Sequence, residues 1–551
     1  MENIAAGKSD LFSGLPKFSD HSMNGNVING SVPAAWRAGF AEKGASLLEG
    51  VRGDFAVGMR LQNGNVFLAV DRFAIRSLCY RVDGNRLHFA ERADDVAGPG
   101  SEIDPQAIYD YLYYHFIPSP RTIFKDVYRL PPGHYALFEN GKLTIERYWT
   151  PSFVEAASAD FDSLRDEFRG LLKHSVAGLL DGGKPGCFLS GGTDSSTVAG
   201  MIREACGNPA ETYSIGFDAD GFDEMEFARM AAKHFGAKHH EYYVTPQDLI
   251  RSIPEVAAYY DQPFGNSSAL PADYCANVER DGIPANPAPG DGGDELFGGN
   301  KRYAKQKLFG IYARIPAMLR KGLFEPLLLQ SPLGKAPIFS KAGSYIRQAK
   351  VPLPDRTQTY NLMSRLGVSE ILTANFIEQV DLLKPLDEQK KVWQEVGAAS
   401  QINLELAFDW RYTLAECDLP KVVGTTALAG IQVAFPMLDH DLVNFSMRLP
   451  GNYKLKGLKL RWFFKEALRG FLPDEIIAKQ KKGFGLPFGV WAAKDPALRA
   501  LAEDSVRTLV DRNIMRSEFV DQLFREKLYE HPSFYGEMIW ISMMLGQWLR
   551  R

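Results

Sequence analysis

The segment LSGGTDSS at residues 189–196 decides how the chain is expected to fold, because it stands between a short apolar run and a helical pattern. The run GCFLS (186–190) predicts a buried strand, and the residues after the glycines predict a helix. Gly191 and Gly192 allow a tight turn whose backbone N–H groups form a nest, and the start of the helix adds positive potential. This strand–turn–helix arrangement suits a phosphate chain, although a glycine turn that only caps a helix has the same letters.

Asp194 within this segment adds a second requirement. Its carboxylate would repel phosphate oxygens unless a divalent cation bridged them, so the segment predicts ATP with Mg²⁺. A nearby stretch, Gly178 to Lys184, has the GxxxxGK spacing of a P-loop. It fails as one because Pro185 replaces the Ser or Thr that would hold magnesium and because the stretch precedes a strand. Transfer of the γ-phosphate is therefore not the default, and cleavage elsewhere on the nucleotide is expected.

A second glycine-rich segment, GDGGDELFGG at residues 290–299, carries three carboxylates close together. One carboxylate on a metal and another exchanging a proton would relieve their repulsion, which indicates metal-ligand and acid/base roles. A solvated turn or a calcium loop is the alternative, but the segment lacks the DxDxDG spacing of an EF-hand.

A third segment, KQKKGFG at residues 479–485, is a run of positive charge. Such a run usually marks a solvated face, and that interpretation applies to Lys479 and Lys482. Lys481 alone does not stand out without further context.

The whole chain has the composition of an ordinary globular protein, with 551 residues, 45% hydrophobic and 24% charged. Its net charge of −4 is too balanced for a protein built around nucleic acid or an anionic membrane. No run is long enough to span a membrane and the first residues lack the order of a signal peptide, so we expect a cytoplasmic protein. The five cysteines are scattered without CxxC spacing, which predicts buried thiols and neither disulfides nor zinc.

The apolar pattern changes along the chain. From Val51 onward, short alternating segments predict a mostly β domain, with a hairpin at Asn140-Gly141 and one helix opened by Asp104-Pro105. Later, brief apolar strands alternate with helical periods and predict a parallel α/β sheet, and the last part of the chain is almost wholly helical. We therefore expect two domains, residues 1–154 and residues 155–551.

In this order, the three segments resemble the synthetase domain of asparagine synthetases and their relatives, whose pyrophosphate loop reads SGGxDS. Further segments that resemble this family are YSIGF (213–217), FDE (222–224), DQPF (261–264), SSALP (267–271) and PMLD (436–439), with VRGDFAV (51–57), DRF (71–73) and RTIFKDVYRLPPGHY (121–135) in the first domain. The resemblance extends over nearly the whole chain after Val51.

The resemblance implies an α/β fold with a degenerate N-terminal-nucleophile-type α+β sandwich, a class II amidotransferase-like domain, joined to an α/β ATP-pyrophosphatase domain of the adenine nucleotide α-hydrolase kind with a helical extension. It implies that a substrate carboxylate attacks the α-phosphorus of ATP and that an amine then displaces AMP. By the same resemblance, Lys481 stabilises charge at the α-phosphate, Asp291 takes a proton from the amine, and Asp194 and Asp294 hold Mg²⁺. The residues implied to bind ATP are Leu189, Ser190, Gly191, Gly192, Thr193, Asp194, Ser195, Ile215, Gly216, Phe217 and Gly290, and those implied to bind the substrate are Ser267, Ser268 and Gln432.

The first domain departs from the glutamine-using members of that family. Those members carry a cysteine as the first residue after removal of Met, whereas residue 2 here is Glu and the first cysteine, Cys79, is expected inside the domain. The segment NGNVIN (24–29) resembles the family's NGEIYN, but Asn26 replaces the Glu expected to bind the substrate amine. We therefore expect that glutaminase activity is lost.

A second departure lies in GIQVAFPMLD (430–439), where the family usually has Glu at the position of Gln432 and Arg at that of Ala434. The joint loss of this pair is either structural drift or the sign of an altered acceptor pocket.

Without glutamine hydrolysis, the nitrogen comes from free ammonia or from an amine already on the substrate. A tethered amine reaches effective molarities of about 10⁵ M or more, and β-lactam synthetases and lasso-peptide cyclases, which have a similar layout, use one. We expect a small-molecule or peptide carboxylate as substrate, a lactam or peptide macrolactam as product and, for a peptide, a leader-peptide-binding or protease partner; neither nucleic acid nor membrane is expected. The alternatives are an ammonia-dependent asparagine synthetase and a non-catalytic nucleotide-binding scaffold.

Overall fold

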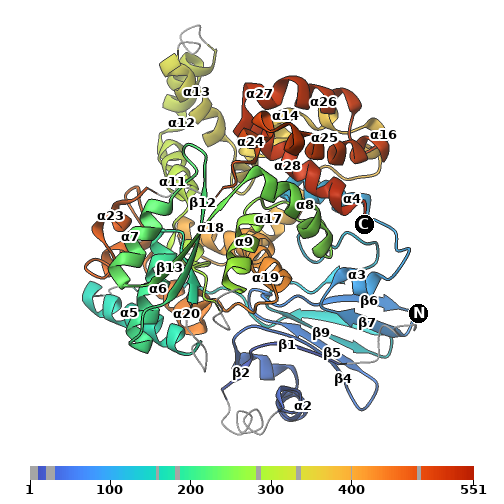
Figure 1. The fold of residues 1–551 in the computed structure, drawn as a ribbon, viewed down its shortest axis with the longest axis vertical. Coiled ribbons are helices and arrows are strands. Elements are labelled where there is room, and N and C mark those ends of the chain that lie inside the picture. Colours follow the sequence, from blue (N-terminus) through green and yellow to red (C-terminus); the bar gives the residue numbers. More distant parts are fainter. Residues whose placement is uncertain are drawn as a thin grey trace.

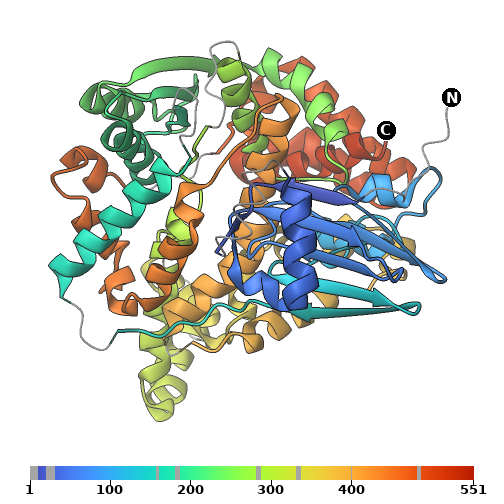
Figure 2. The same ribbon diagram turned by 90° about the horizontal axis from the view of Figure 1, so that it is seen from below.

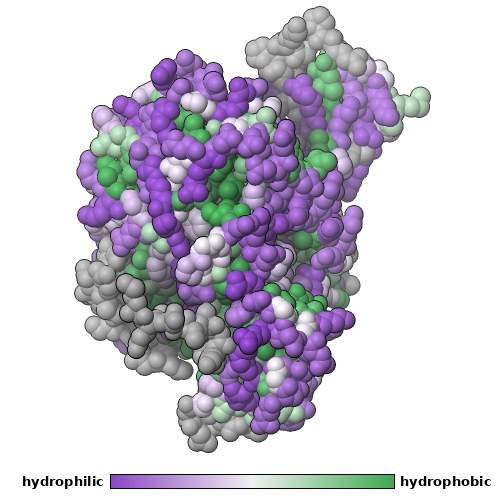
Figure 3. Space-filling view, turned by 90° about the vertical axis from the view of Figure 1, so that its right-hand side faces the viewer, coloured by the Kyte–Doolittle hydropathy of each residue, from purple (hydrophilic) through white to green (hydrophobic). Residues whose placement is uncertain are grey.

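The computed structural model describes residues 10–19, 31–156, 160–179, 186–280, 287–330, 337–398, 400–480 and 485–551. An antiparallel β region from the first part of the chain lies against a larger region of parallel sheet and helices (Figures 1 and 2). The face drawn in Figure 3 is mostly hydrophilic, with hydrophobic residues in scattered patches. Among the described residues, no helix combines the length and the apolar character needed to cross a bilayer.

The first region is built on a five-stranded antiparallel sheet. Its strands, in spatial order, are β1 (Leu11–Gly14), β4 (Phe55–Arg60), β5 (Val66–Val70), β9 (His134–Glu139) and β10 (Lys142–Arg147). Because side chains alternate along a strand, Val57 and Met59 pack against helix α2 (Val32–Lys43), whereas Ala56 packs toward a second sheet. That second sheet has the order β7 (Arg86–Ala90), β6 (Cys79–Asp83) and β8 (Tyr128–Arg129).

The structure confirms the predicted hairpin turn and shows how far each cysteine is buried. Asn140 and Gly141 join β9 to β10 with φ angles of 50° and 78°, which confirms the predicted turn. All five cysteines are free: three are buried (Cys79, Cys187 and Cys275) and two are half-buried (Cys206 and Cys417). The prediction of buried thiols is therefore right for three of the five.

The second region contains the predicted parallel sheet. Strands β11 (Gly186–Phe188), β12 (Glu211–Phe217) and β13 (Lys238–Val244) lie side by side in that order, all parallel. The helices that connect and cover them are α5 (Phe161–Ala177), α6 (Thr193–Cys206), α7 (Met225–Phe235), α8 (Pro246–Tyr259) and α9 (Ala269–Arg280). Cys187 and Leu189 pack with α6 and α7, whereas Ile215 and Phe217 pack with α8 and α9, so the two sheet faces have separate cores. The segment 189–196 follows β11 and opens α6, as predicted.

Helices dominate the remainder of the second region. The longer ones are α11 (Lys301–Arg314), α13 (Pro337–Lys350), α17 (Lys384–Glu395), α18 (Gln401–Asp409), α19 (Leu419–Leu428), α20 (His440–Arg448), α24 (Phe488–Lys494), α25 (Pro496–Asp511) and α28 (Pro532–Trp548). A π-helical segment, η6 (Trp410–Asp418), joins α18 to α19 in one continuous helical run. Such segments are often found at functional sites because they redirect side chains. Here η6 places Glu416 at the interface of the two regions and Asp418 in the main cavity, which is described below.

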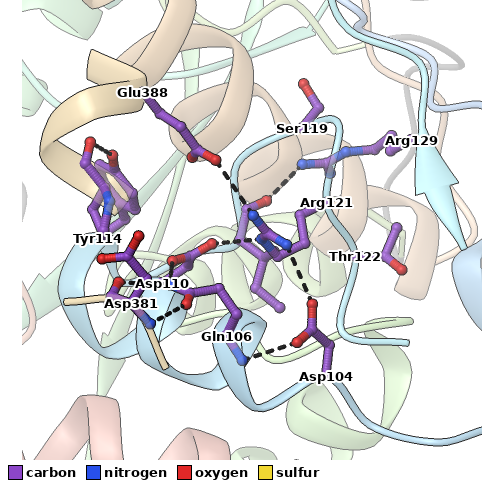
Figure 4. Close-up of polar contacts among 12 residues, drawn as sticks. Asp104, Gln106, Asp110, Tyr114, Ser119, Arg121, Thr122, Arg129, Asp381 and Glu388 are labelled. Atoms are coloured by element: carbon purple, nitrogen blue, oxygen red, sulfur yellow. Dashed lines mark hydrogen bonds and ion pairs between the residues drawn. The ribbon is translucent and has the colours of Figure 1, made fainter. Parts of the chain in front are cut away.

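Helix α4 (Pro105–Tyr114) belongs to the first region but packs in the core of the second. It begins as predicted, with the side chain of Asp104 accepting a hydrogen bond from the Gln106 N–H. Its apolar side chains share a core with α8 and α28, which lies beside it in Figure 1, and the Tyr111 hydroxyl donates to the Ile541 carbonyl at 2.9 Å. Figure 4 shows how Arg121 adds ionic contacts here, with Asp110 at 2.7 Å and Glu388 at 3.3 Å. The two regions are thus joined through a common core.

Glu416, on η6, forms a second ionic contact between the regions. Its side chain is 3% exposed and accepts hydrogen bonds from Arg129, Arg411 and the Ser119 hydroxyl. Burial alone would raise the pKa of Glu416, but the charges of Arg129 and Arg411 outweigh that effect and hold the pKa below its ordinary value. Glu416 is therefore ionised, and two guanidinium groups depend on its charge.

The variant Glu416→Gln tests this contact. We expect a loss of unfolding free energy of about 3 kcal/mol near neutral pH, because two buried guanidinium groups lose their counter-charge. Since the folded-state pKa is depressed, the contribution of Glu416 is present above its ordinary pKa of 4.5 and is lost as the pH falls below it. Urea unfolding at pH 7 and pH 4 would measure both effects.

The matched control is Glu388→Gln, which removes a half-exposed carboxylate from Arg121 at the same interface. A loss below about 1 kcal/mol is expected there. Equal losses for the two variants would contradict the assignment of Glu416 as the central buried charge.

Candidate active site

The main cavity opens beyond the carboxyl ends of the parallel strands. Its volume is about 880 Å³, and its lining comes from the loop after β11, the middle of β12, the 290–299 segment and several residues between 458 and 480. Ligands of parallel α/β sheets bind at this edge because the loops and the helix N-termini converge there. The predicted segments 189–196 and 290–299 therefore meet in one cavity.

The loop between β11 and α6 has the predicted shape for phosphate. Gly191 has a φ of 67°, and a Cβ there would lie 2.4 Å from the backbone nitrogen of Ala228, so a larger residue does not fit. The Ser195 hydroxyl accepts a hydrogen bond from the Ser190 N–H at 3.2 Å and closes the loop on itself. Gly192 is the N-cap of α6 and has no side chain to cap it. The first N–H groups of α6 are therefore available for an anion.

Two carboxylates from distant segments meet beside this loop. Asp194 lies in the first turn of α6 and Asp294 in the first turn of the short helix α10 (Gly293–Phe297). Both accept hydrogen bonds from the same nitrogen, Nη1 of Arg461, at 2.6 Å and 2.8 Å respectively. Two carboxylates close enough to share one nitrogen could also share one Mg²⁺ ion. That ion would take its other oxygens from phosphates and water. The structure thus brings together the residue pair to which the resemblance assigned the metal.

Glycines make this approach possible. A Cβ at Gly290 would lie 2.7 Å from the backbone nitrogen of Ser195, and a Cβ at Gly299 would lie 1.7 Å from a carboxylate oxygen of Asp294. Both values are shorter than any side chain tolerates. Gly290 therefore serves close packing of the two loops, and Gly299 leaves room for the Asp294 carboxylate of its own segment.

Asp291 lies in the same cavity but has a different partner. The Lys421 ammonium donates to its carboxylate at 3.1 Å and lies 3.5 Å from Asp418. Burial disfavours the charge of Lys421, yet these two carboxylates raise its pKa above the ordinary range. Lys421 is therefore a permanent cation that keeps the Asp291 carboxylate in place, where it can accept a proton from a substrate.

Glu295, the third carboxylate of the 290–299 segment, is in a different state. Burial raises the pKa of Glu295 to about 8, and the nearby Asp418 adds to the effect. The environment of Glu295 therefore favours its protonated form. The three carboxylates of this segment differ in environment, as their crowding in the sequence requires: Asp294 is paired with a guanidinium, Asp291 with an ammonium, and the pKa of Glu295 is raised.

The expectation that Lys479 lies on a solvated face is wrong. Its side chain is 9% exposed, its ammonium donates to the Gly191 carbonyl at 3.2 Å and lies 3.1 Å from Glu224. The chain returns to the phosphate loop at this point, which the local charge run does not reveal. Lys481, Lys482 and the segment 24–29 lie outside the described residues, so the role assigned to Lys481 stays a prediction.

The other predicted residues divide into two groups. Those that line the cavity with the phosphate loop are Leu189, Ser190, Gly192, Thr193, Asp194, Ser195, Ile215, Ser268 and Gly290. Gly191, Gly216, Phe217, Ser267 and Gln432 are not among the lining residues that are described, and Gln432 is exposed to solvent. Tyr213 and Ser214 of the same strand also line the cavity, so the lining on β12 ends at Ile215.

Sequence reasoning missed three charged residues of the site. Asp418 and Lys421 lie at the start of the apolar helix α19. A charged residue in such an apolar run could have been predicted to be buried with a partner of opposite charge. Arg461 precedes the aromatic run WFF (462–464) without any comparable signal, because one Arg among many Lys and Arg residues does not stand out.

The sequence is similar to two known domain families and to several asparagine synthetases. The family described as asparagine synthase matches residues 167–550, and the glutamine amidotransferase domain matches residues 37–149. Asparagine synthetase [glutamine-hydrolyzing] 1 of Bacillus subtilis is 26% identical over 519 residues, covering 92% of this chain and 78% of its own. A putative asparagine synthetase [glutamine-hydrolyzing] of Mycobacterium tuberculosis is 26% identical over 471 residues, covering 82% and 70%. Amidase chry2 of Gibberella zeae is 25% identical over 498 residues, covering 81% and 71%.

The variant Gly290→Ala tests the close approach of the two loops. The added Cβ meets backbone atoms of Asp194 and Ser195, which cannot rotate away, so we expect a loss of stability of about 1–3 kcal/mol. Thermal unfolding measures the loss, and Gly170→Ala is the matched control. Gly170 is an exposed helical position with open space around it, where Ala should stabilise by roughly 0.5–1 kcal/mol. A stable Gly290→Ala variant would mean that the loops are not in contact.

Proposed function

The chain belongs to the asparagine synthase family, and from that premise we propose that it joins a substrate carboxylate to an amine through an acyl-adenylate, without hydrolysing glutamine. It is an asparagine synthetase-like, ATP-dependent, amide-forming ligase. The observation that carries the proposal is the convergence of Asp194 and Asp294 on one nitrogen of Arg461 beside the phosphate loop. This pair lies where the phosphates of ATP would pass between the loop and the cavity.

The first step forms a bond between a carboxylate oxygen of the substrate and the α-phosphorus of ATP, and it breaks the bond from that phosphorus to the departing pyrophosphate. The turn at Gly191, the start of α6 and Ser195 bind the phosphate chain. Mg²⁺, held by Asp194 and Asp294, would neutralise phosphate charge and so favour departure of pyrophosphate. Lys481 is proposed to stabilise charge at the α-phosphate, for which the typical effect of such a group is about 10²–10³ in rate.

In the second step the amine attacks the acyl carbon, and the bond to AMP breaks. The amine must lose a proton, and Asp291, which the Lys421 ammonium holds in place, is the proposed acceptor. Apolar side chains such as Ala272 and Val422 also line the cavity, and they would help to exclude the water that hydrolyses a reactive acyl-adenylate.

The first domain supports a source of nitrogen other than glutamine. Within residues 1–154 the sequence contains one cysteine, Cys79, which is buried on β6. Burial raises the pKa of the Cys79 thiol well above its ordinary value, so it is not a nucleophile for glutamine. In the sequence, Asn26 replaces the Glu expected to bind the glutamine amine, which also supports a nitrogen source other than glutamine.

A substrate that carries its own amine is favoured over aspartate, because a tethered amine supplies the nitrogen that glutamine would otherwise provide. The described cations that line the cavity are Lys301, Lys421, Lys459, Arg461, Lys465, Arg469 and Lys479. Of these, Arg461 and Lys479 contact the loop after β11, and Lys421 is paired with Asp291 and Asp418. A lactam- or macrolactam-forming ligase, like β-lactam synthetases and lasso-peptide cyclases, is the favoured form, with a leader-peptide-binding or protease partner if the substrate is a peptide.

Labelled ATP tests the reaction class. With ATP labelled at the α-phosphate and a panel of acids that carry an amine, we expect labelled AMP and pyrophosphate and no labelled ADP. Asp294→Asn should lower AMP formation by at least about 10², because one metal ligand is lost. Asp162→Asn, an exposed substitution on α5, is the matched control and should be unaffected. Formation of ADP would exclude the proposal.

The same assay separates the alternatives. Pyrophosphate release with aspartate and ammonium as the substrates would favour an ammonia-dependent asparagine synthetase, and release of glutamate from glutamine would contradict the loss of glutaminase activity. A non-catalytic scaffold would show no exchange of labelled pyrophosphate into ATP with any acid.

A further inference from the structure

Arg461 occupies the space between the two metal-binding carboxylates. Its Nη1 donates to Asp194 at 2.6 Å, to Asp294 at 2.8 Å and to the Thr193 hydroxyl at 3.0 Å, and its Nη2 donates to the other oxygen of Asp194. The Arg461 side chain is 5% exposed and lies over the ring of Phe464 at 4.0 Å. The guanidinium thus neutralises both carboxylates inside the protein.

A guanidinium and a divalent cation cannot use these oxygens together. Mg²⁺ binds oxygen at about 2.1 Å, which places it on the same side of the carboxylates as Nη1. Two positive charges this close would also repel strongly. Binding of Mg²⁺ to Asp194 and Asp294 therefore requires that Arg461 leave them.

The phosphate loop gives the guanidinium another place to bind. Thr193, which Arg461 already contacts, is the first residue of α6 at the end of the phosphate loop. The Nε–H of Arg461 is buried and has no hydrogen-bond acceptor, so one donor is unused in the present arrangement. Guanidinium groups bind phosphate with two parallel hydrogen bonds, and Nε supplies one of them. A pyrophosphate group in the loop would satisfy this donor.

The backbone of Arg461 is consistent with a specialised position. Its φ is 54°, in the left-handed region that non-glycine residues rarely adopt, and it directly precedes helix α22 (Trp462–Ala467). Such strained positions persist where the surroundings determine the conformation, and they cluster at ligand sites.

We propose that Arg461 is an exchangeable counter-ion: it holds Asp194 and Asp294 together when no nucleotide is bound, and it moves to the pyrophosphate group when a divalent cation takes the two carboxylates. The inference rests on the proposed function, because it needs these aspartates to bind a metal with nucleotide. It makes Arg461 a positioning residue for the metal and a binding residue for pyrophosphate. It also means that the metal binds weakly until nucleotide arrives.

Titration with Mn²⁺, followed by electron paramagnetic resonance on the nucleotide-free protein, tests the exchange. Wild type should bind Mn²⁺ weakly, and Arg461→Gln should bind it at least roughly tenfold more tightly, because a competing positive charge is gone. Arg461→Lys should fall between them, since it keeps the charge but not the fork of donors. The metal-free Arg461→Gln variant should have a lower Tm, and Mn²⁺ should raise that Tm more than it raises the Tm of wild type.

The second half of the exchange is tested with inorganic pyrophosphate. In the presence of Mn²⁺, Arg461→Gln should bind pyrophosphate at least tenfold more weakly than wild type, because the guanidinium is no longer available to the phosphates. A residue that only stabilises the fold would not tighten metal binding and weaken pyrophosphate binding at the same time.

Two control variants isolate the effect. Arg356→Gln removes another buried arginine, which donates to Gln306 and to backbone carbonyls away from the cavity, and it should lower the Tm without changing Mn²⁺ affinity. Combining Arg461→Gln with Asp294→Asn should remove the gain in Mn²⁺ affinity. If Arg461→Gln does not fold, the same comparison is made with Arg461→Lys.

The outcomes separate this inference from the proposed function. Equal Mn²⁺ affinity of nucleotide-free wild type and Arg461→Gln would overturn the exchange. If wild type bound no Mn²⁺ even with ATP or pyrophosphate, the proposed function itself would fail, since the aspartates would then hold no metal.

Discussion

The mutual repulsion of Asp194 and Asp294 is the constraint on which the rest of the site depends. The two carboxylates lie in the first turns of different helices, and both contact one guanidinium nitrogen. Each position is favourable for its own helix, because an acidic residue in the first turn interacts well with the helix dipole. Together they need a shared cation, and this requirement accounts for the buried Arg461; glycines such as Gly290 and Gly293 let the two loops approach closely enough to share it.

The first region contributes to this cavity as support. Its helix α4 lies in the core of the second region, and its Arg129 binds Glu416 on η6. Two residues further along the same π-helical segment, Asp418 lines the cavity and contacts Lys421, the partner of Asp291. A loss of the first region would therefore disturb a buried charge network that reaches the site. This gives a physical reason to retain a domain whose cysteine is buried and unreactive.

Charge at this site is arranged by pairing. Lys421 has two carboxylate neighbours, the environment of Glu295 raises its pKa, and at the interface of the two regions Glu416 binds two guanidinium groups. This pairing explains why the composition did not indicate a charged site. A net charge of −4 is compatible with a cavity lined by many charged side chains of both signs. It also explains why the prediction of a solvated Lys479 was wrong. Lys479 stands in a run of lysines, but its ammonium donates to the carbonyl of Gly191, which is distant in the sequence.

The sequence by itself determined the local elements: the strand and helix around residues 189–196, the hairpin at Asn140-Gly141, the capped helix after Asp104 and the parallel order of the second region. These follow from nearby residues, because glycine conformation, caps and apolar period act over a few positions. It also identified Asp194, Asp291 and Asp294 as a set. Only the tertiary structure decided which cation each carboxylate meets, because Arg461 and Lys421 come from segments more than a hundred residues away and their partners depend on how the helices pack.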